Sequence, residues 1–445
     1  MTEKVHLISL GCPKNRVDSE VMVGKLQRGP FEMVDRPEDA DVIIVNTCSF
    51  IQPATEESID TVLEMSGYKT AGSCKKLVVT GCMVQRYGAS LESELPEVDH
   101  FLGTGEYHRI DDVLTARAGE APRSYIDTPL YIHDELAPRI NSWMPHSAYL
   151  KISEGCDHRC SFCIIPTLRG KLRSRPIQSL VAEAERLVAG GVRELNLVSQ
   201  DSTAYGRDLG DGTDIGGLMR ALCKIEGLDW LRLHYVYPLG VPDSLLQAIA
   251  EEPKIVKYLD IPLQHASGPM LKAMRRGVTR AGQERILDRI RRAVPGIVVR
   301  TTFIVGFPGE TEDDFAELMD FVRAQRFERV GVFTYHPEDG THGATLPDQV
   351  PEEVRLERQR VLMQLQAELS RGLNEALVGT EHEILIDGPS KENPTVLTGR
   401  LSTQAPDVDG HVFLDGPPAD VAAGQLRRVR ITRASEYDLV ARVLP

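Results

Sequence analysis

Residues 153–166 read Ser-Glu-Gly-Cys-Asp-His-Arg-Cys-Ser-Phe-Cys-Ile-Ile-Pro and carry three closely spaced cysteines, Cys156, Cys160 and Cys163. Three thiolates at this spacing can bind three irons of a four-iron–four-sulfur cluster from a single loop. The fourth iron then has no protein ligand nearby, and an open iron indicates catalysis, because electron-transfer clusters usually have cysteine at all four positions. The alternatives are a structural zinc site or three unrelated buried cysteines. Zinc usually takes two ligand pairs, and no second Cys or His pair follows at a finger-like distance.

Outward from this loop, short apolar runs alternate with helical patterns. Strands are predicted at residues 148–152, 194–198, 230–234, 257–261, 298–305 and 329–334, and helices between them include 179–189, 244–251, 281–294 and 312–324. Six parallel strands with intervening helices predict an α/β fold of the partial TIM-like barrel kind, with its active site at the C-terminal ends of the strands. The cysteine loop follows the first of these strands and is therefore expected at that face.

At the cysteine loop the chain resembles the radical S-adenosylmethionine (SAM) superfamily. The resemblance implies that SAM binds the open iron through its amino and carboxylate groups. It also implies that SAM is cleaved to a 5′-deoxyadenosyl radical, which takes hydrogen from an unactivated carbon. Gln200 and Asp201 follow the second predicted barrel strand. Gln200 is expected to bind the polar groups of SAM, although a satisfied loop residue is the alternative, and Asp201 is assigned no role.

The first part of the chain predicts a separate, small doubly wound α/β domain. Its strands are expected at 5–10, 41–46 and 76–80, with helices at 18–26 and 53–65. A cysteine follows each strand, namely Cys12, Cys48 and Cys82. The carboxyl ends of parallel strands meet at one crevice, so these cysteines predict a second cluster with its own open iron. Taken singly, each cysteine is more typical of a small buried apolar residue, and this is the interpretation given to Cys74 and Cys223. Three in equivalent positions make coincidence much less expected.

The last part of the chain changes pattern again. A charged amphipathic helix is predicted at 351–377, and short strands with turn signals follow it, which predicts a small antiparallel β-barrel. This segment resembles the TRAM domain. From residue 378 onward it holds ten acidic and seven basic residues and is therefore net acidic.

The order of the three parts resembles the methylthiotransferase family, whose members attach a methylthio group to an unactivated carbon. The expected domains are 1–118 (auxiliary cluster), 119–141 (linker), 142–376 (radical SAM core) and 377–445 (TRAM-like barrel). The resemblance implies two 4Fe-4S clusters and two SAM molecules per turnover, one to methylate cluster-bound sulfur and one to form the radical. It assigns the SAM cluster to Cys156, Cys160 and Cys163, and the auxiliary cluster to Cys12, Cys48 and Cys82.

Two substrates divide this family: a tRNA adenosine and an aspartate of small-subunit ribosomal protein S-twelve. The segment Cys12-Pro13-Lys14-Asn15 and residues 165–175 resemble the protein-modifying branch, since the tRNA branch typically has Gln-Met after that cysteine. This implies attack at the aspartate β-carbon, with electrons from a flavodoxin or ferredoxin. A net acidic C-terminal barrel also suits a basic ribosomal protein better than tRNA phosphates. The counter-argument is a basic run, Arg427, Arg428, Arg430 and Arg433, which keeps tRNA as the alternative.

Composition agrees with an enzyme of the cytoplasm. The 445 residues include 51 basic and 65 acidic ones, a net charge of −14, which argues against nonspecific nucleic-acid binding. Eight cysteines are too sparse for a disulfide scaffold. Neither a signal peptide nor an apolar run of membrane-spanning length is recognisable, so a soluble, cytoplasmic protein without a membrane partner is expected. The distant alternative is a non-enzymatic iron–sulfur redox sensor. A sensor would not need a barrel with a substrate-sized cavity.

Overall fold

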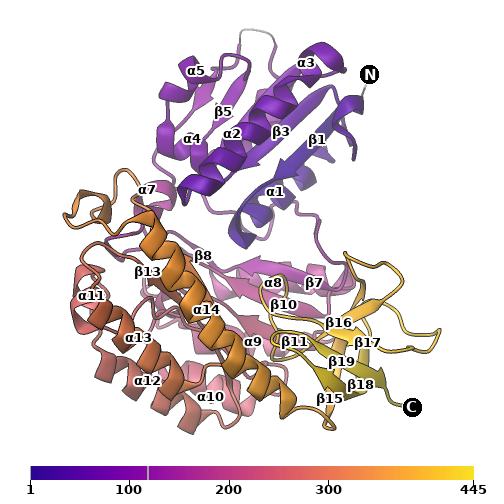
Figure 1. Cartoon of the computed structure of the whole chain (residues 1–445). Helices are drawn as coiled ribbons and strands as arrows, with labels where there is room; N and C mark the ends of the chain where they lie inside the picture. Colours follow the sequence, from indigo (N-terminus) through magenta and orange to yellow (C-terminus); the bar gives the residue numbers. More distant parts are fainter. Residues whose placement is uncertain (1, 118–119) are drawn as a thin grey trace.

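The N-terminal part is a six-stranded parallel sheet in the order β2-β1-β3-β4-β5-β6 (Figure 1). The structure, a computed structural model, describes residues 2–117 and 120–445. The central strands are short runs of Val and Ile with both faces buried, as parallel strands covered by helices require. The strands of this sheet are β1 (Glu3–Ser9), β2 (Phe31–Met33), β3 (Val42–Thr47), β4 (Lys76–Gly81), β5 (His100–Leu102) and β6 (Ser124–Tyr125).

Helices pack on both faces of this sheet and form two apolar cores, so the doubly wound fold is confirmed. Helix α1 begins at Pro13, five residues before the predicted start, because proline is accommodated in the first helical turn. The helices are α1 (Pro13–Leu26), α2 (Gln52–Ser66), α3 (Tyr68–Ala71), α4 (Cys82–Tyr87), α5 (Ser90–Glu94) and α6 (Ile110–Thr115).

The stretch expected as a linker contributes to two parts of the molecule. Its strand β6 pairs with β5 and extends the N-terminal sheet. Farther on, Arg139 forms buried ion pairs with Glu20 of α1 and with Glu183, which belongs to the central part of the chain. This segment therefore fastens the N-terminal sheet to the central part. The expected boundary between residues 118 and 119 lies outside the described residues.

The central part contains all six predicted strands, arranged as two three-stranded parallel sheets, β11-β10-β7 and β12-β13-β14. A single bridge between Leu231 and Ile255 links the two sheets where a continuous barrel would have a full strand pair. One apolar core runs through both halves, so the partial barrel is confirmed. Its strands are β7 (Ser147–Lys151), β10 (Glu194–Val198), β11 (Trp230–Leu233), β12 (Tyr258–Asp260), β13 (Val298–Val305) and β14 (Arg329–Thr334).

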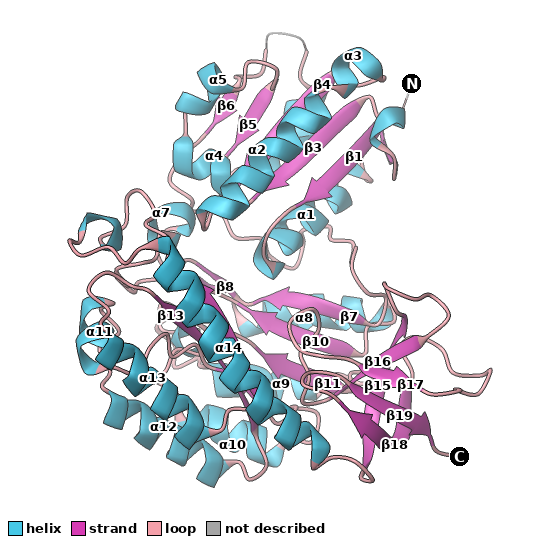
Figure 2. Ribbon diagram, viewed as in Figure 1, coloured by secondary structure: helices cyan, strands magenta, loops and turns pink. Residues whose placement is uncertain are grey.

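Helices cover the outside of this partial barrel (Figure 2). They are α8 (Ile177–Ala189), α9 (Ile215–Cys223), α10 (Asp243–Glu251), α11 (Gly268–Ala273), α12 (Arg280–Ala293) and α13 (Glu312–Gln325). A short antiparallel pair, β8 (Ser153–Glu154) and β9 (Arg173–Ser174), encloses the cysteine loop together with helix α7 (Ile165–Arg169). In the described residues, no helix combines the length and the apolar character that crossing a membrane requires.

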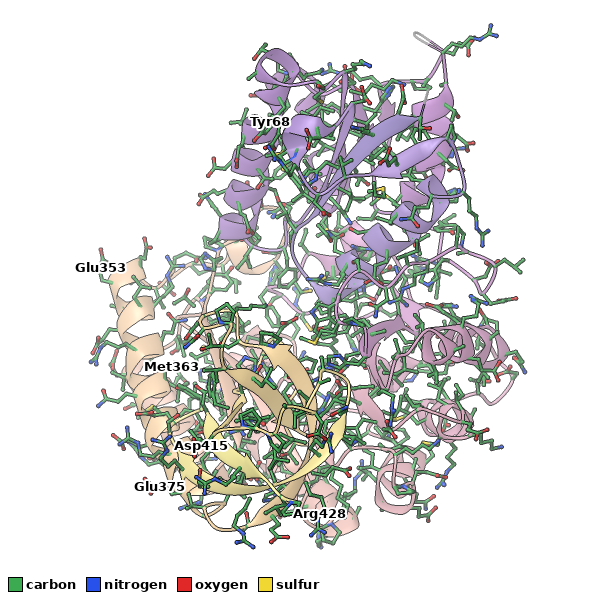
Figure 3. The ribbon with its side chains drawn as sticks, turned by 90° about the vertical axis from the view of Figure 1, so that its right-hand side faces the viewer. Tyr68, Glu353, Met363, Glu375, Asp415 and Arg428 are labelled. Atoms are coloured by element: carbon green, nitrogen blue, oxygen red, sulfur yellow. The ribbon has the colours of Figure 1, made fainter. Side chains whose placement is uncertain are left out.

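The long helix α14 (Glu352–Glu375) leads to a closed five-stranded barrel (Figure 3). The prediction of an antiparallel barrel needs one correction, because β17 and β19 pair in parallel while the other four strand pairs are antiparallel. This parallel pair closes the barrel. The strands are β15 (Glu381–Pro389), β16 (Leu397–Leu401), β17 (Val412–Leu414), β18 (Leu426–Ala434) and β19 (Leu439–Val443).

The C-terminal barrel docks on the N-terminal ends of the central strands. Glu194, the first residue of β10, is fully buried between Arg232 of β11 and Arg400 of β16. The charges of Arg400 and Arg232 outweigh the effect of burial and hold the pKa of the Glu194 carboxyl well below its usual range. Tyr258, the first residue of β12, donates to Asp409 at 2.8 Å. The cysteine loop lies at the other end of these strands.

Candidate functional site

The three strand-end cysteines of the N-terminal sheet meet at one edge, as predicted. Ser9, Asn46 and Thr80 are register partners, so the three strands leave the sheet side by side. Gly11 has φ +83°, and a Cβ there would lie 2.6 Å from the Cβ of Cys48. Only glycine therefore lets the Cys12 loop pass so close to Cys48. We refer to Cys12, Cys48 and Cys82 as the N-terminal triad.

The N-terminal triad is largely buried and is held by polar neighbours. Burial, with contributions from Cys82 and Cys12, raises the pKa of the Cys48 thiol to about 12. The side-chain amide of Asn15 donates to the carbonyls of Leu10 and Thr47, which fixes two of the three loops relative to each other.

A cation from the central part of the chain completes the surroundings of this triad. The guanidinium of Arg169, at the end of α7, lies 3.5 Å from the sulfur of Cys82. Burial raises the pKa of the Cys82 thiol, while Arg169 acts in the opposite direction by favouring the thiolate. The N-terminal triad is therefore assembled by two parts of the chain that are separate in sequence.

The second set, Cys156, Cys160 and Cys163, is shaped by backbone contacts within its loop. Gly155 has φ +84°, and a Cβ there would lie 2.0 Å from the carbonyl oxygen of Lys171. The amide of Cys156 donates to the carbonyl of Gly170, and that of Cys163 donates to the carbonyl of Cys160, which curls the loop. We refer to these three cysteines as the loop triad.

Each sulfur of the loop triad has its own hydrogen-bond donor. The backbone amides of His158 and Ile165 donate to Cys156 and Cys163, and the guanidinium of Arg276 lies 3.4 Å from the sulfur of Cys160. Burial raises the pKa of the Cys156 thiol to about 11 and that of the Cys163 thiol to about 12. The donors are therefore poised to stabilise thiolates once a metal replaces the protons.

The two triads suit a cluster better than a single ion. Among the residues that the structure describes, no three Cys, His, Asp or Glu side chains gather closely enough to hold one metal ion. This geometry does not fit a tetrahedral zinc site. In a cubane cluster each thiolate binds a different iron, so the sulfurs need not converge on one point. Three sulfurs in each triad, with N–H donors to all three in the loop triad and to Cys48 and Cys82 in the N-terminal triad, fit an iron–sulfur cluster.

Buried charges connect the two triads. Lys151 of β7 contacts both Asp18 of α1 and Glu154 of β8. Arg169 contacts the same two carboxylates, at 2.7 and 3.2 Å. Although burial opposes it, the charges of Lys151 and Arg169 hold the pKa of the Glu154 carboxyl well below its usual range. Glu154 is thus an anion that lies beside the loop triad and is tied through Arg169 to Cys82.

Gln200 lies where the sequence places it, at the mouth of the second barrel strand. Its side-chain nitrogen donates to Glu154 at 2.6 Å, while its side-chain oxygen is buried and has no protein partner. That oxygen can accept a hydrogen bond from a ligand. Whether Gln200 binds SAM stays a prediction. Asp201 instead caps the turn at Thr203 and accepts from the His158 ring, which is a structural role.

An aromatic stack flanks the loop triad. The His158 ring stacks on Tyr237 at 3.8 Å, and Arg276 lies over the Tyr237 ring at 4.3 Å. A cavity of about 170 Å³ opens beside Cys156 and is lined also by His158 and Asp201. The stack holds the Arg276 guanidinium against Cys160.

Sequence reasoning missed Lys14, Tyr235 and Arg169 as residues of the candidate site. Lys14 is only two positions from Cys12, so its place beside a cysteine motif was a usable signal. Arg169 lies in the segment 165–175 that resembles the protein-modifying branch, but nothing there points to Cys82. No local pattern distinguishes Tyr235. Among the histidines, burial lowers the pKa of His234 to about 3 and that of His265 to about 4, so both are neutral core residues.

The basic run of the C-terminal barrel is largely engaged in ion pairs. Arg428 and Arg430 both contact Glu381, and Arg427 contacts Asp420. Arg428 lies on the outer surface of this barrel (Figure 3). These pairs reduce the charge available for phosphate groups.

Three segments of the chain match known families. Residues 4–103 match the uncharacterized protein family UPF0004, residues 150–322 match the radical SAM superfamily, and residues 378–444 match the TRAM domain. The N-terminal match contains the N-terminal triad, and the radical SAM match contains the loop triad.

Curated relatives match over the full length. The chain is 51% identical over 442 residues to the ribosomal protein uS12 methylthiotransferase RimO of Myxococcus xanthus, covering 99% of this chain and 92% of the relative. It is 52% identical over 443 residues to the RimO of an Anaeromyxobacter species, covering 100% of this chain and 93% of that one. The RimO of Geobacter sulfurreducens is 49% identical over 443 residues, with 99% of both chains covered.

Solved structures share the fold at low identity. The radical SAM methyltransferase TsrM from Kitasatospora setae, with cobalamin and a [4Fe-4S] cluster bound, has a TM-score of 0.55 at 16% identity and 75% coverage of both chains. The cobalamin-dependent SAM radical enzyme OxsB has a TM-score of 0.52 at 14% identity, covering 81% of this chain and 56% of that one. These likenesses support the α/β architecture described above.

Proposed function

Because the chain belongs to the RimO family of ribosomal protein uS12 methylthiotransferases, and is thereby a radical SAM methylthiotransferase, we propose that it attaches a methylthio group to the β-carbon of an aspartate in uS12. The observation that carries the proposal is the pair of three-cysteine sets. Each lies at the carboxyl ends of parallel strands, and the buried charges of Arg169 and Glu154 connect them.

The proposed cofactors are two 4Fe-4S clusters and two SAM molecules per turnover. The loop triad, Cys156, Cys160 and Cys163, would hold the SAM-binding cluster, and the N-terminal triad, Cys12, Cys48 and Cys82, would hold the auxiliary one. When bound, these groups supply the radical that opens a C–H bond and the methylated sulfur that replaces the hydrogen. Two triads, each with three sulfurs, support this division because each cluster would keep one iron open.

The chain's own residues bind, orient and exclude water. The amides of His158 and Ile165 and the Arg276 guanidinium stabilise thiolate charge in the loop triad. Glu154 holds Gln200 by its nitrogen, so that its unpartnered oxygen is available to a donor such as an ammonium group of SAM. Cys48 and Cys82 are buried, which limits the access of water to the N-terminal triad.

Further assignments rest on the same proposal. The reducing partner is expected to be a flavodoxin or ferredoxin, and the enzyme is expected in the cytoplasm, where its ribosomal substrate is made. We place the domain boundaries at 1–118, 119–141, 142–376 and 377–445, with β6 attached to the first domain in space. The net acidic charge of the C-terminal barrel favours the protein substrate over tRNA.

The test is a mass-shift assay on the anaerobically reconstituted, reduced enzyme with SAM, offered uS12 and unmodified tRNA side by side. A methylthio adduct on an aspartate of uS12 supports the proposal. An adduct on tRNA adenosine would keep the chemistry and replace the substrate. No adduct on either, without 5′-deoxyadenosine, would favour the redox sensor.

Iron content tests the number of clusters separately. The wild type should bind about twice as much iron as a Cys156/Cys160/Cys163→Ala triple variant, since each triad ligates one cluster. The matched control is the Cys12/Cys48/Cys82→Ala triple variant, which should also retain half of the iron. Equal iron in the wild type and either variant would contradict the two-cluster proposal.

A further inference from the structure

Lys14 reaches from the N-terminal sheet to the mouth of the central barrel. It lies in the first turn of α1, two residues after Cys12. Its ammonium lies 3.4 Å from the carbonyl oxygen of Ser199, the residue before Gln200, and 3.7 Å from the centre of the Tyr235 ring. Lys14 therefore stands between the N-terminal triad and the strand ends of the barrel.

Unlike the neighbouring buried cations, Lys14 has no acidic partner. Lys151 and Arg169 each contact two carboxylates, Asp18 and Glu154. In the described parts of the chain, 2–117 and 120–445, no Asp or Glu forms an ion pair with Lys14. The residue as a whole is half-buried, while its ammonium lies deep among neighbouring atoms. Glu154 acts on this ammonium from beyond ion-pair distance, and among the described residues its one hydrogen bond is to Ser199, so donors remain for an incoming carboxylate.

Tyr235 fixes the position of this ammonium. It lies two residues beyond the end of β11 and has φ +59°, a left-handed conformation that is strained for an aromatic residue. The strain is held by hydrogen bonds on both sides: its amide donates to Asp260, and its carbonyl accepts from the amide of Ser202. Strained residues of this kind concentrate at functional sites. The ring face directs Lys14 toward the barrel mouth through a cation–π contact.

We propose that Lys14 binds the side-chain carboxylate of the target aspartate. This inference rests on the proposed function and deepens it by naming the group that recognises the substrate. In aspartate the carboxylate is bonded directly to the β-carbon. An ion pair at about 2.8 Å from the Lys14 ammonium thus fixes the β-carbon next to the N-terminal triad. The same ion pair discriminates against neutral substrates, because they would leave the Lys14 ammonium without a partner.

A double-mutant cycle on the reconstituted full-length enzyme with SAM tests this inference. The partners are wild type and Lys14→Gln, each titrated with a fluorescent uS12 peptide carrying either the target Asp or Asn. Wild type should bind the Asp peptide roughly tenfold to a hundredfold more tightly than the Asn peptide, as expected for a charge-assisted hydrogen bond. Lys14→Gln should bind the two peptides with similar affinity. Lys25→Gln, a change of the same kind at the other end of α1, should keep the wild-type preference.

A second variant protects the test against misfolding near Cys12. Tyr235→Leu changes the barrel side of the contact and removes the ring that holds the ammonium, so it should reduce the Asp preference as well. An unchanged Asp preference in both Lys14→Gln and Tyr235→Leu would overturn the inference. If the wild type modifies the Asp peptide and both variants still bind the Asp peptide more tightly than the Asn peptide, the inference fails and the proposed function stands. If wild type neither binds nor modifies uS12, the proposed function fails first.

Discussion

Removal of the Glu338 carboxylate is expected to loosen the contact between the N-terminal sheet and the barrel. Arg86 of α4 and Glu338, in the loop after β14, form an ion pair at 2.7 Å with 6% and 5% of their side chains exposed. Glu338 also accepts the amide of Gln52 at the start of α2, and Arg86 donates to the carbonyl of Ser49, next to Cys48. This pair thus connects the barrel to the loop that carries one of the triad cysteines.

The size of the effect follows from leaving one charge without its partner. Glu338→Ala leaves the buried Arg86 uncompensated, which costs about 3–5 kcal/mol for a buried pair. Replacing both groups, as in Arg86→Met with Glu338→Leu, removes the unpaired charge and should recover most of that loss. The expected coupling energy is therefore several kcal/mol.

Hydrogen exchange measures this contact locally, which matters because a chain of several domains does not unfold in one step. In Glu338→Ala the amides near residues 49–55 and 335–345 should exchange on the order of a hundredfold faster, the equivalent of about 3 kcal/mol. The double variant should exchange at a rate close to wild type. The matched control is Glu317→Ala, since Glu317 pairs with Arg280 on the surface and should change little. Unaltered exchange in Glu338→Ala, or a double variant as labile as the single one, would refute the reasoning.

Three further predictions concern the loop triad and the core. Arg276→Gln removes a charged donor to Cys160. It should lower the reduction potential of a cluster reconstituted on the loop triad by on the order of tens of millivolts, and a potentiometric titration with an unchanged midpoint would contradict this. Gly155→Ala places a Cβ 2.0 Å from a carbonyl oxygen and should abolish iron binding by the loop triad, whereas Gly210→Ala, with no atom within 4 Å, should retain it. Below about pH 6.5 the protein should lose stability, because burial lowers the pKa of three neutral histidines that charge on unfolding, His133, His234 and His265. The pKa of each histidine is lower in the folded than in the unfolded protein, so the free energy of unfolding is highest above pH 6.5 and falls toward pH 4. The loss is about 2 kcal/mol per histidine at pH 5. In urea titrations a His133→Gln variant should lose less stability between pH 6.5 and pH 5 than the wild type.

The position of the C-terminal barrel bears on how a substrate approaches. It covers the N-terminal ends of β10, β11 and β12, through contacts such as Arg400 with Glu194 and Tyr258 with Asp409. The triads lie at the opposite ends of these strands. A strand of five residues spans roughly 17 Å, so a substrate that contacts both the barrel and the triads must be at least that long. A folded protein such as uS12 meets this requirement.

From the sequence, the strands that carry the cysteines could be predicted, whereas β2, β5 and β6 at the edges of the N-terminal sheet were missed, because they are only two or three residues long. Apolar β-branched runs such as Ile43–Val45 and Val78–Val79 are typical of buried parallel strands. The cysteine after each strand is then placed by the sheet itself, because parallel strands end at the same edge. The loop triad could also be predicted from the sequence, since its three cysteines lie within eight residues and need no distant segment to bring them together.

Only the tertiary structure decided what surrounds these cysteines. Arg169 contacts Cys82 across 87 positions of sequence, and Lys14 contacts Ser199 across 185. The C-terminal barrel reaches Glu194 through Arg400, 206 positions later. No local pattern encodes such contacts, because propensity and periodicity act over a few residues, whereas packing between domains depends on where whole surfaces meet. The positions of strand ends and cysteines depend on short-range sequence patterns. The charged residues beside the cysteines come from distant segments and reach them only when the domains pack together.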